Sequence, residues 1–83
     1  NYPNPFNGAT EIKYVLPTSA YTVLSVFDLQ GKKIIDLVDK IQTAGQYRVT
    51  WKPDVASGTY FYRLETQDKA TAFSETRKMI YLK

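Results

Sequence analysis

Short segments in which apolar and polar residues alternate run through the whole chain, and turn residues separate them at close spacing. Residues 10–16 are the clearest example, with Ile12, Tyr14 and Leu16 at every second position and Pro17 directly after them. Alternation with a period of two places successive side chains on opposite faces of a β-strand. We therefore expect a chain built of β-strands that are each buried on one face.

Six segments have strand character, and glycine, proline or aspartate marks most of their ends. They are residues 10–16, 21–28, 33–38, 47–51, 59–66 and 72–82, the last being either one strand or two short strands broken near Glu75. About six or seven strands in so short a chain predict an all-β fold, an immunoglobulin-like antiparallel β-sandwich.

The third segment departs from simple alternation. Its apolar residues do not follow a strict period of two, which indicates a β-bulge or burial on both faces. Residues 34–41 also show some helical spacing, but their β-branched content favours a strand. We expect residues 39–46 to form a loop with Gly45 near its end.

The opening residues 1–7 cannot form a helix, because Pro3 and Pro5 lack amide donors and bias the residues before them to extended geometry. We expect a rigid extended lead-in whose Tyr2 and Phe6 pack onto the edge of a core. The chain begins with Asn1 rather than methionine, and we interpret residues 1–83 as a single domain excised or processed from a longer protein.

Composition removes most catalytic chemistry. The chain has no cysteine and no histidine, so disulfides, thiolate nucleophiles, cysteine zinc sites and Ser-His-Asp triads are excluded. The eight acidic residues form neither a paired carboxylate motif nor a calcium-binding loop, and the glycines form no phosphate-binding loop. We expect no catalytic, cofactor-binding or metal-binding residues and no enzyme activity.

The charge is weakly positive and dispersed. Eleven basic and eight acidic residues give a formal charge of +3, without the concentrated basic stripe that nucleic-acid binding requires. No apolar run approaches the ~20 residues that span a bilayer. Neither a nucleic-acid partner nor a transmembrane segment is expected.

Aromatic residues make up 14% of the chain, and they have two interpretations. Exposed rings in one plane form a carbohydrate-binding platform, whereas inward rings fill a core. The core interpretation is favoured for five rings on predicted inward faces, namely Tyr14, Tyr47, Trp51, Tyr60 and Tyr62. Tyr60 and Tyr62 also resemble a tyrosine corner, in which a phenol hydroxyl bonds a nearby backbone group.

Three glycines, Gly31, Gly45 and Gly58, lie where a predicted strand must reverse or begin. A positive φ at each position is the expected reason for glycine. Lys78, near the end of the chain, is expected to be a surface lysine.

Taken in order, six motifs cover the whole chain. They are Tyr2-Pro3-Asn4-Pro5-Phe6-Asn7, Ile12-x-Tyr14-x-Leu16-Pro17, Val26-Phe27-Asp28-x-x-Gly31-Lys32, Gly45-x-x-x-Val49-x-Trp51, Ser57-Gly58-x-Tyr60-x-Tyr62-x-Leu64 and Lys78-Met79-Ile80-x-Leu82. This order resembles the type A C-terminal sorting domain of the type IX secretion system, a family found on exported proteins of Bacteroidetes and their relatives. It is also similar to the immunoglobulin-like domain of the flagellar hook-capping protein.

The resemblance implies a non-catalytic folded signal that directs a larger protein across the outer membrane, to the cell surface or outside. Its implied partners are the type IX translocon, a sortase-like peptidase and an upstream cargo domain in the same chain. The family pattern implies a set of candidate sorting-signal residues: Pro3, Asn4, Pro5, Asn7, Gly31, Gly45, Gly58, Tyr60 and Lys78. The alternative is an immunoglobulin-like accessory module that acts as a spacer, stabilises a secreted enzyme or binds carbohydrate.

Overall fold

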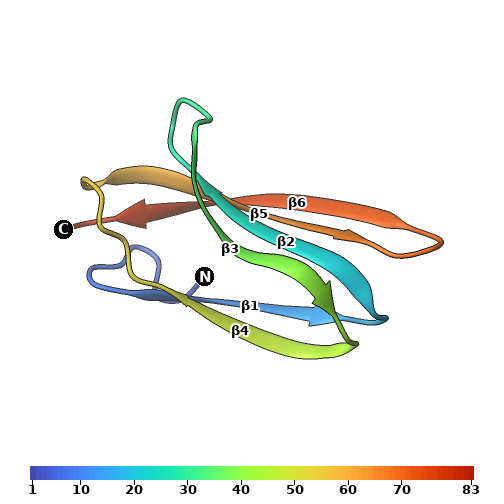
Figure 1. The fold of residues 1–83 in the computed structure, drawn as a ribbon. Helices are drawn as coiled ribbons and strands as arrows, with labels where there is room; N and C mark the ends of the chain where they lie inside the picture. Colours follow the sequence, from blue (N-terminus) through green and yellow to red (C-terminus); the bar gives the residue numbers. More distant parts are fainter.

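Antiparallel β-strands account for all of the regular structure in the computed structural model, which describes residues 1–83 (Figure 1). The strands are β1 (Thr10–Leu16), β2 (Ala20–Phe27), β3 (Lys33–Gln42), β4 (Gly45–Trp51), β5 (Gly58–Gln67) and β6 (Ala72–Tyr81). The predicted all-β class is confirmed, with six strands. The structure contains no helix long and apolar enough to cross a membrane.

The strands form two sheets that face each other as a sandwich (Figure 1). The larger sheet has the order β3-β2-β5-β6, and the smaller sheet consists of β1 and β4. This arrangement is consistent with the predicted immunoglobulin-like sandwich. The smaller sheet is only two strands wide, so it leaves part of the larger sheet uncovered.

The core lies between the sheets and follows the alternation in the sequence. Ile12 of β1 is 2% exposed, while Leu24 of β2 and Met79 of β6 are fully buried. The burial of each such side chain contributes about 1.5–3 kcal/mol through the hydrophobic effect. Four polar residues are buried as well, namely Thr10, Thr22, Ser25 and Gln42.

Two β-bulges explain why the apolar residues of β3 do not alternate. The pairing with β2 skips Leu37 between Val38 and Asp36, and it skips Ile34 between Ile35 and Lys33. Each extra residue resets the phase of the strand. Ile34 and Leu37 therefore both pack against the core, although they are three positions apart.

The predicted loop over residues 39–46 is wrong at both ends, because β3 continues to Gln42 and pairs with the beginning of β2, and β4 already begins at Gly45. Asp39, Lys40 and Gln42 are polar, so this part of the strand shows no apolar alternation in the sequence. Gln42 faces the core and is 9% exposed, and its side-chain oxygen accepts a 2.6 Å hydrogen bond from the hydroxyl of Tyr14. The buried amide oxygen is thereby satisfied inside the sandwich.

The last strand is continuous, so a break near Glu75 does not occur. Every residue of β6 from Ala72 to Tyr81 pairs with β5 without a shift in register. Glu75 interrupts the apolar pattern because its half of the strand lies beyond the smaller sheet and is exposed.

The aromatic rings are mainly structural. Tyr14, Trp51, Tyr60 and Tyr62 are buried, and Tyr47 is half-buried and stacks on Tyr14 with 5.3 Å between ring centroids. The most exposed rings lie on three separate elements: Tyr2 in the lead-in, Tyr21 on β2 and Phe73 on β6. They form no ring pair with one another.

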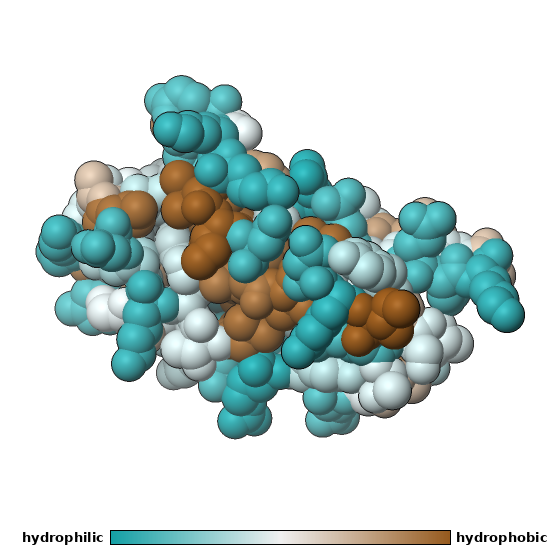
Figure 2. All heavy atoms as spheres, viewed as in Figure 1, coloured by the Kyte–Doolittle hydropathy of each residue, from teal (hydrophilic) through white to brown (hydrophobic).

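The surface carries one further apolar feature. Figure 2 shows hydrophobic side chains gathered at the centre of one face, along β3 where it passes above β4. Ile35 and Ile41 of β3 are 43% and 73% exposed. This side of the sandwich is polar around its rim (Figure 2).

Candidate recognition site

The lead-in, residues 1–7, joins the two sheets at one end of the sandwich. Tyr2 and Glu11 exchange two backbone hydrogen bonds of 2.9 Å, which attaches the lead-in to β1. The amide of Phe6 donates to the carbonyl of Ile80 at 3.0 Å, and the amide of Leu82 donates to the carbonyl of Phe6 at 2.8 Å. The lead-in therefore extends both sheets by short pairings, antiparallel on β1 and parallel on β6.

The side chain of Asn4 completes the attachment to β6. Its amide nitrogen donates to the carbonyl of Lys78 at 3.2 Å, and its oxygen accepts from the amide of Ile80 at 2.9 Å. A carboxamide has one acceptor and one donor group, as a peptide unit has. Asn4 thus takes the place of a neighbouring strand where the backbone turns away, and we call Asn4 and Phe6 with residues 78–82 the seam.

Phe6 anchors the lead-in in the core. It is 3% exposed, and its ring centroid lies 6.0 Å from that of Trp51 and 5.2 Å from that of Tyr81. Trp51 in turn meets Tyr60 edge-on at 5.8 Å. The prediction that Phe6 packs onto a core edge is confirmed, whereas Tyr2 is 80% exposed and does not.

The lead-in is bent rather than extended, so that part of the prediction is wrong. Residues 3–5 form a bend, and both Pro3 and Pro5 follow cis peptide bonds. The carbonyl of Pro3 accepts a 2.9 Å hydrogen bond from the buried hydroxyl of Thr10. The bend brings Asn4 to β6 while Tyr2 stays on β1.

Two of the three candidate glycines have the predicted backbone. Gly31 has φ +85° in the β2–β3 turn, where the side chain of Asp28 accepts from the amides of Gln30 and Lys32. Gly45 has φ +151° at the start of β4. Both conformations are strained for a residue with a side chain.

Gly58 is a correction, because its φ is not positive. A Cβ atom there would approach nothing closer than 4.0 Å, the contact being with the ring of Tyr60. Neither the backbone nor a close approach requires glycine at the start of β5.

Tyr60 forms the tyrosine-corner contact that the sequence predicts. Its hydroxyl donates to the carbonyl of Ala56 at 2.7 Å, and its ring is 7% exposed. The hydroxyl of Tyr62 instead accepts a 2.9 Å hydrogen bond from the amino group of Asn1. Lys78 has the predicted exposed side chain, while its carbonyl belongs to the seam.

The fold brings most of the candidate residues to one end of the molecule. The lead-in, the Gly31 turn, the start of β5 and the end of β6 all lie at the end that holds both termini (Figure 1). Asn7 is exposed beside the seam. Gly45 is separate, because it pairs with Leu16 at the opposite end.

The family resemblance also made the segment Lys78 to Leu82 a candidate, but sequence reasoning did not include Phe6, whose backbone joins the lead-in to Ile80 and Leu82 in the seam. The available signal was an aromatic residue within a polar, proline-rich opening segment. No such signal exists for the backbone partners on β6, because pairing over 74 or more positions leaves no local pattern.

No group of three or more acidic residues lies close enough to hold a metal ion. The marked changes in carboxyl pKa lie outside the seam: hydrogen bonds from Ser25 and Lys33 lower the pKa of Asp36, and those around the β5–β6 turn lower the pKa of Asp68. Burial raises the pKa of the Tyr14 and Tyr62 hydroxyls.

Comparison with known proteins agrees with the sequence resemblance. The sequence model of the secretion system C-terminal sorting domain matches residues 1–81 of this chain. No curated protein and no solved structure matched it. The chain is thus a sorting module, and it belongs to the family of type IX secretion C-terminal sorting domains.

The domain is a sorting signal for type IX secretion, and it accompanies export across the outer membrane to the cell surface or outside in Bacteroidetes-type bacteria. Membership implies interaction with the secretion machinery and an upstream cargo. Sorting domains of this kind are generally non-catalytic.

Proposed function

We propose that the type IX translocon recognises the folded lead-in end of this domain, and that Lys78 provides the exposed charge in that contact. Residues 1–83 act as one non-catalytic sorting unit of a longer secreted protein. The cargo precedes the unit in the chain, and a sortase-like peptidase acts on the exported product.

The observation that carries this proposal is the seam. Asn4 and Lys78 are 74 positions apart, yet the Asn4 side chain bonds the Lys78 carbonyl. The surface formed by Pro3, Asn4, Pro5, Asn7 and Lys78 exists only when the first and last parts of the domain are folded together. A receptor that reads this surface accepts a folded domain and rejects an unfolded chain.

The lysine side chain is well suited to recognition rather than to stability. Lys78 is exposed and forms no salt bridge, in contrast to its neighbour Arg77, which pairs with Glu75. Its charge is therefore available to an acidic or carbonyl-rich partner.

The test is a reporter that carries an export signal for the inner membrane, fused ahead of the domain in a host with the type IX machinery. We expect the reporter at the cell surface or in the medium. Lys78→Gln should lower export about tenfold, corresponding to about 1.4 kcal/mol of binding free energy. Lys40→Gln is the matched control, because Lys40 is an exposed lysine at the other end of the same sheet.

Circular dichroism and thermal unfolding of both variants separate recognition from folding. Equal export of the Lys78→Gln and Lys40→Gln variants contradicts the role of Lys78. A reporter that stays in the periplasm even with the unchanged domain favours the accessory-module alternative instead.

A further inference from the structure

The smaller sheet has an edge that is only partly used. β1 pairs with β4 on one side, and on the other side its single partner is Tyr2, opposite Glu11. In an antiparallel strand the N–H and C=O of one residue point to the same side, and the side alternates along the chain. Because Glu11 faces the lead-in, Lys13 and Val15 present their backbone groups on the same open side.

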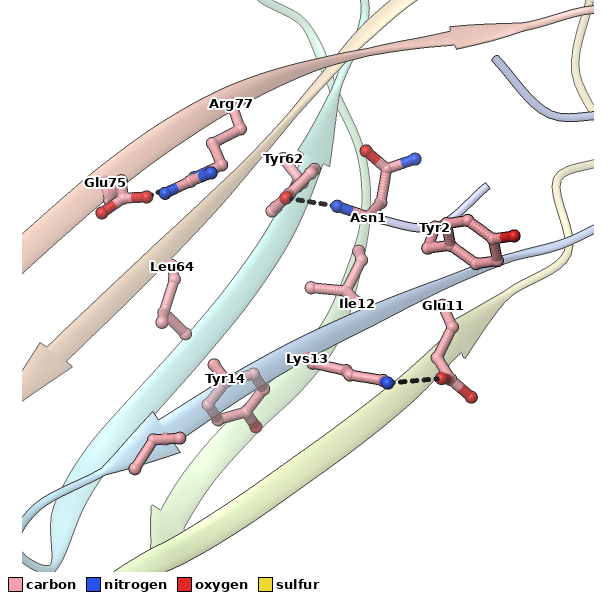
Figure 3. A pocket seen from close by; sticks show the side chains of 11 residues that line it. Asn1, Tyr2, Glu11, Ile12, Lys13, Tyr14, Tyr62, Leu64, Glu75 and Arg77 are labelled. Atoms are coloured by element: carbon pink, nitrogen blue, oxygen red, sulfur yellow. Dashed lines mark hydrogen bonds and ion pairs between the residues drawn. The ribbon is translucent and has the colours of Figure 1, made fainter. Parts of the chain in front are cut away.

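An open groove runs along this edge. It has a volume of about 460 Å³ and lies between β1 and the uncovered parts of β5 and β6, with Leu64 and Tyr62 among its lining residues (Figure 3). A second hollow of about 410 Å³ continues it, since Val15 and Leu64 line both, and extends it to Phe73. The groove thus follows the free edge over residues 12–16, about 17 Å at ~3.4 Å per residue.

The lead-in points into this groove. The amino group of Asn1 lies 2.9 Å from the hydroxyl of Tyr62, and Figure 3 shows Asn1 reaching from the β1 side across to Tyr62. Asn1 and Tyr2 are themselves lining residues. A residue attached to Asn1 therefore starts inside the groove, beside Lys13.

The existing pairing also fixes the register of any continuation. Tyr2 lies opposite Glu11 in an antiparallel bridge. Stepping back along the lead-in, the residue immediately before Asn1 falls opposite Lys13, and the residue two positions earlier falls opposite Val15. These are the two β1 residues with free backbone groups.

We propose that the segment preceding Asn1 in the cargo-bearing protein adds to β1 as a third, antiparallel strand and fills this groove. This inference rests on the proposed function, since a sorting unit needs a cargo ahead of it. The added strand covers the inward face of β6 in its exposed half, which contains Phe73. It also couples the end of the cargo rigidly to the folded signal.

The two faces of the added strand have different chemistry. Residues opposite Lys13 and Val15 share their outward face and contact solvent. The second and fourth residues before Asn1 point inward, over Leu64 and towards the exposed ring of Phe73. The inward positions therefore require apolar side chains, and the outward positions tolerate polar ones.

Amide hydrogen exchange tests the pairing directly. The peptide covering residues 12–16 is compared by mass spectrometry between the cargo-bearing protein and the 83-residue domain. We expect exchange in this peptide to slow about tenfold or more when the cargo is present, because the strand must open before exchange. The outer edge of β3 is the internal control and should not change.

Designed extensions test the register. Val-Thr-Val-Thr placed directly before Asn1 puts valine at the inward positions, whereas Thr-Val-Thr-Val puts it at the outward ones. We expect the amides of Lys13 and Val15, resolved by NMR, to be protected at least about tenfold more by the first extension than by the second. Gly-Ser-Gly-Ser provides the unpaired reference.

Equal exchange at residues 12–16 with and without cargo overturns the proposal, as does equal protection by the two valine-containing extensions. A separate Val-Thr-Val-Thr peptide that protects these amides better than the attached one also overturns it, because the groove then serves a partner strand. All measurements use purified protein without translocon, so their failure leaves the export result for Lys78→Gln unaffected.

Discussion

The two halves of β6 share one alternating pattern but differ in burial. Phe73, Met79 and Tyr81 all lie at odd positions of a strand without a bulge, so they face the same side. Met79 and Tyr81 are 0% and 5% exposed, whereas Phe73 is 45% exposed. The lead-in and its Phe6 cover the half of β6 that contains Met79 and Tyr81, which we call the sealed half. No element covers the half that contains Phe73, which we call the open half. The covering element, rather than the strand itself, determines burial.

The largest expected effect is a loss of stability when the core beneath the sealed half is disrupted. Trp51 is 4% exposed and packs between Phe6 and Tyr60, so Trp51→Ala should lower the free energy of unfolding by about 3–5 kcal/mol. Phe73→Ala, in the open half, should cost less than about 1 kcal/mol. Urea unfolding with an unchanged slope measures both, and similar losses for the two variants would contradict the comparison.

The next effect concerns the seam that seals the first half. Asn4→Ala removes one hydrogen bond to the Lys78 carbonyl and one from the Ile80 amide, which should cost about 1–2 kcal/mol. Asn7→Ala is the control and should stay within about 0.5 kcal/mol, because Asn7 is exposed and contributes its carbonyl to Ala9. A larger loss for Asn7 than for Asn4 would show that the side chain of Asn4 does not hold the lead-in.

The sequence predicts the parts of the molecule that depend on neighbouring residues. Alternation locates β1 with its observed ends, and it identifies Trp51 and Tyr60 as core residues. It fails where a long-range partner decides. The strand at residues 39–42 depends on pairing with β2, and the burial of Gln42 depends on a tyrosine 28 positions away.

The candidate site divides in the same way. A left-handed glycine is a local property, and it is predicted at Gly31. The contact between Asn4 and Lys78 is not local. Family resemblance identified both residues as candidates, and only the fold shows that they are in contact. The sequence left open whether the last strand continues past Glu75, because its continuity follows from pairing with β5.

A smaller effect is expected for two tyrosines that make the same kind of contact at opposite ends of the molecule. Tyr60 donates to the carbonyl of Ala56 in a partly buried bond of 2.7 Å, and Tyr47 donates to that of Thr43 in an exposed bond of 2.6 Å. Tyr60→Phe should cost about 1 kcal/mol, and Tyr47→Phe less than about 0.5 kcal/mol because water replaces the exposed hydroxyl. Thermal unfolding ranks the variants. The reverse order would mean that the hydroxyl of Tyr47 contributes more to stability than that of Tyr60.

The smallest effect lies in the turn at the open end and depends on pH. Asp68 accepts hydrogen bonds from the amides of Ala70 and Thr71 and from the hydroxyl of Thr18. The bond from Ala70, followed by those from Thr18 and Thr71, holds the pKa of the Asp68 carboxyl below its usual range in the folded protein. The ionised carboxylate therefore stabilises the fold above the ordinary aspartate pKa, and this contribution is lost as the pH falls through the lower, folded value. Asp68→Asn should lower the unfolding temperature at neutral pH, and the difference from the unchanged domain should shrink in acid. A difference that stays constant from neutral pH into the acid range would mean that the charge of Asp68 does not hold this turn.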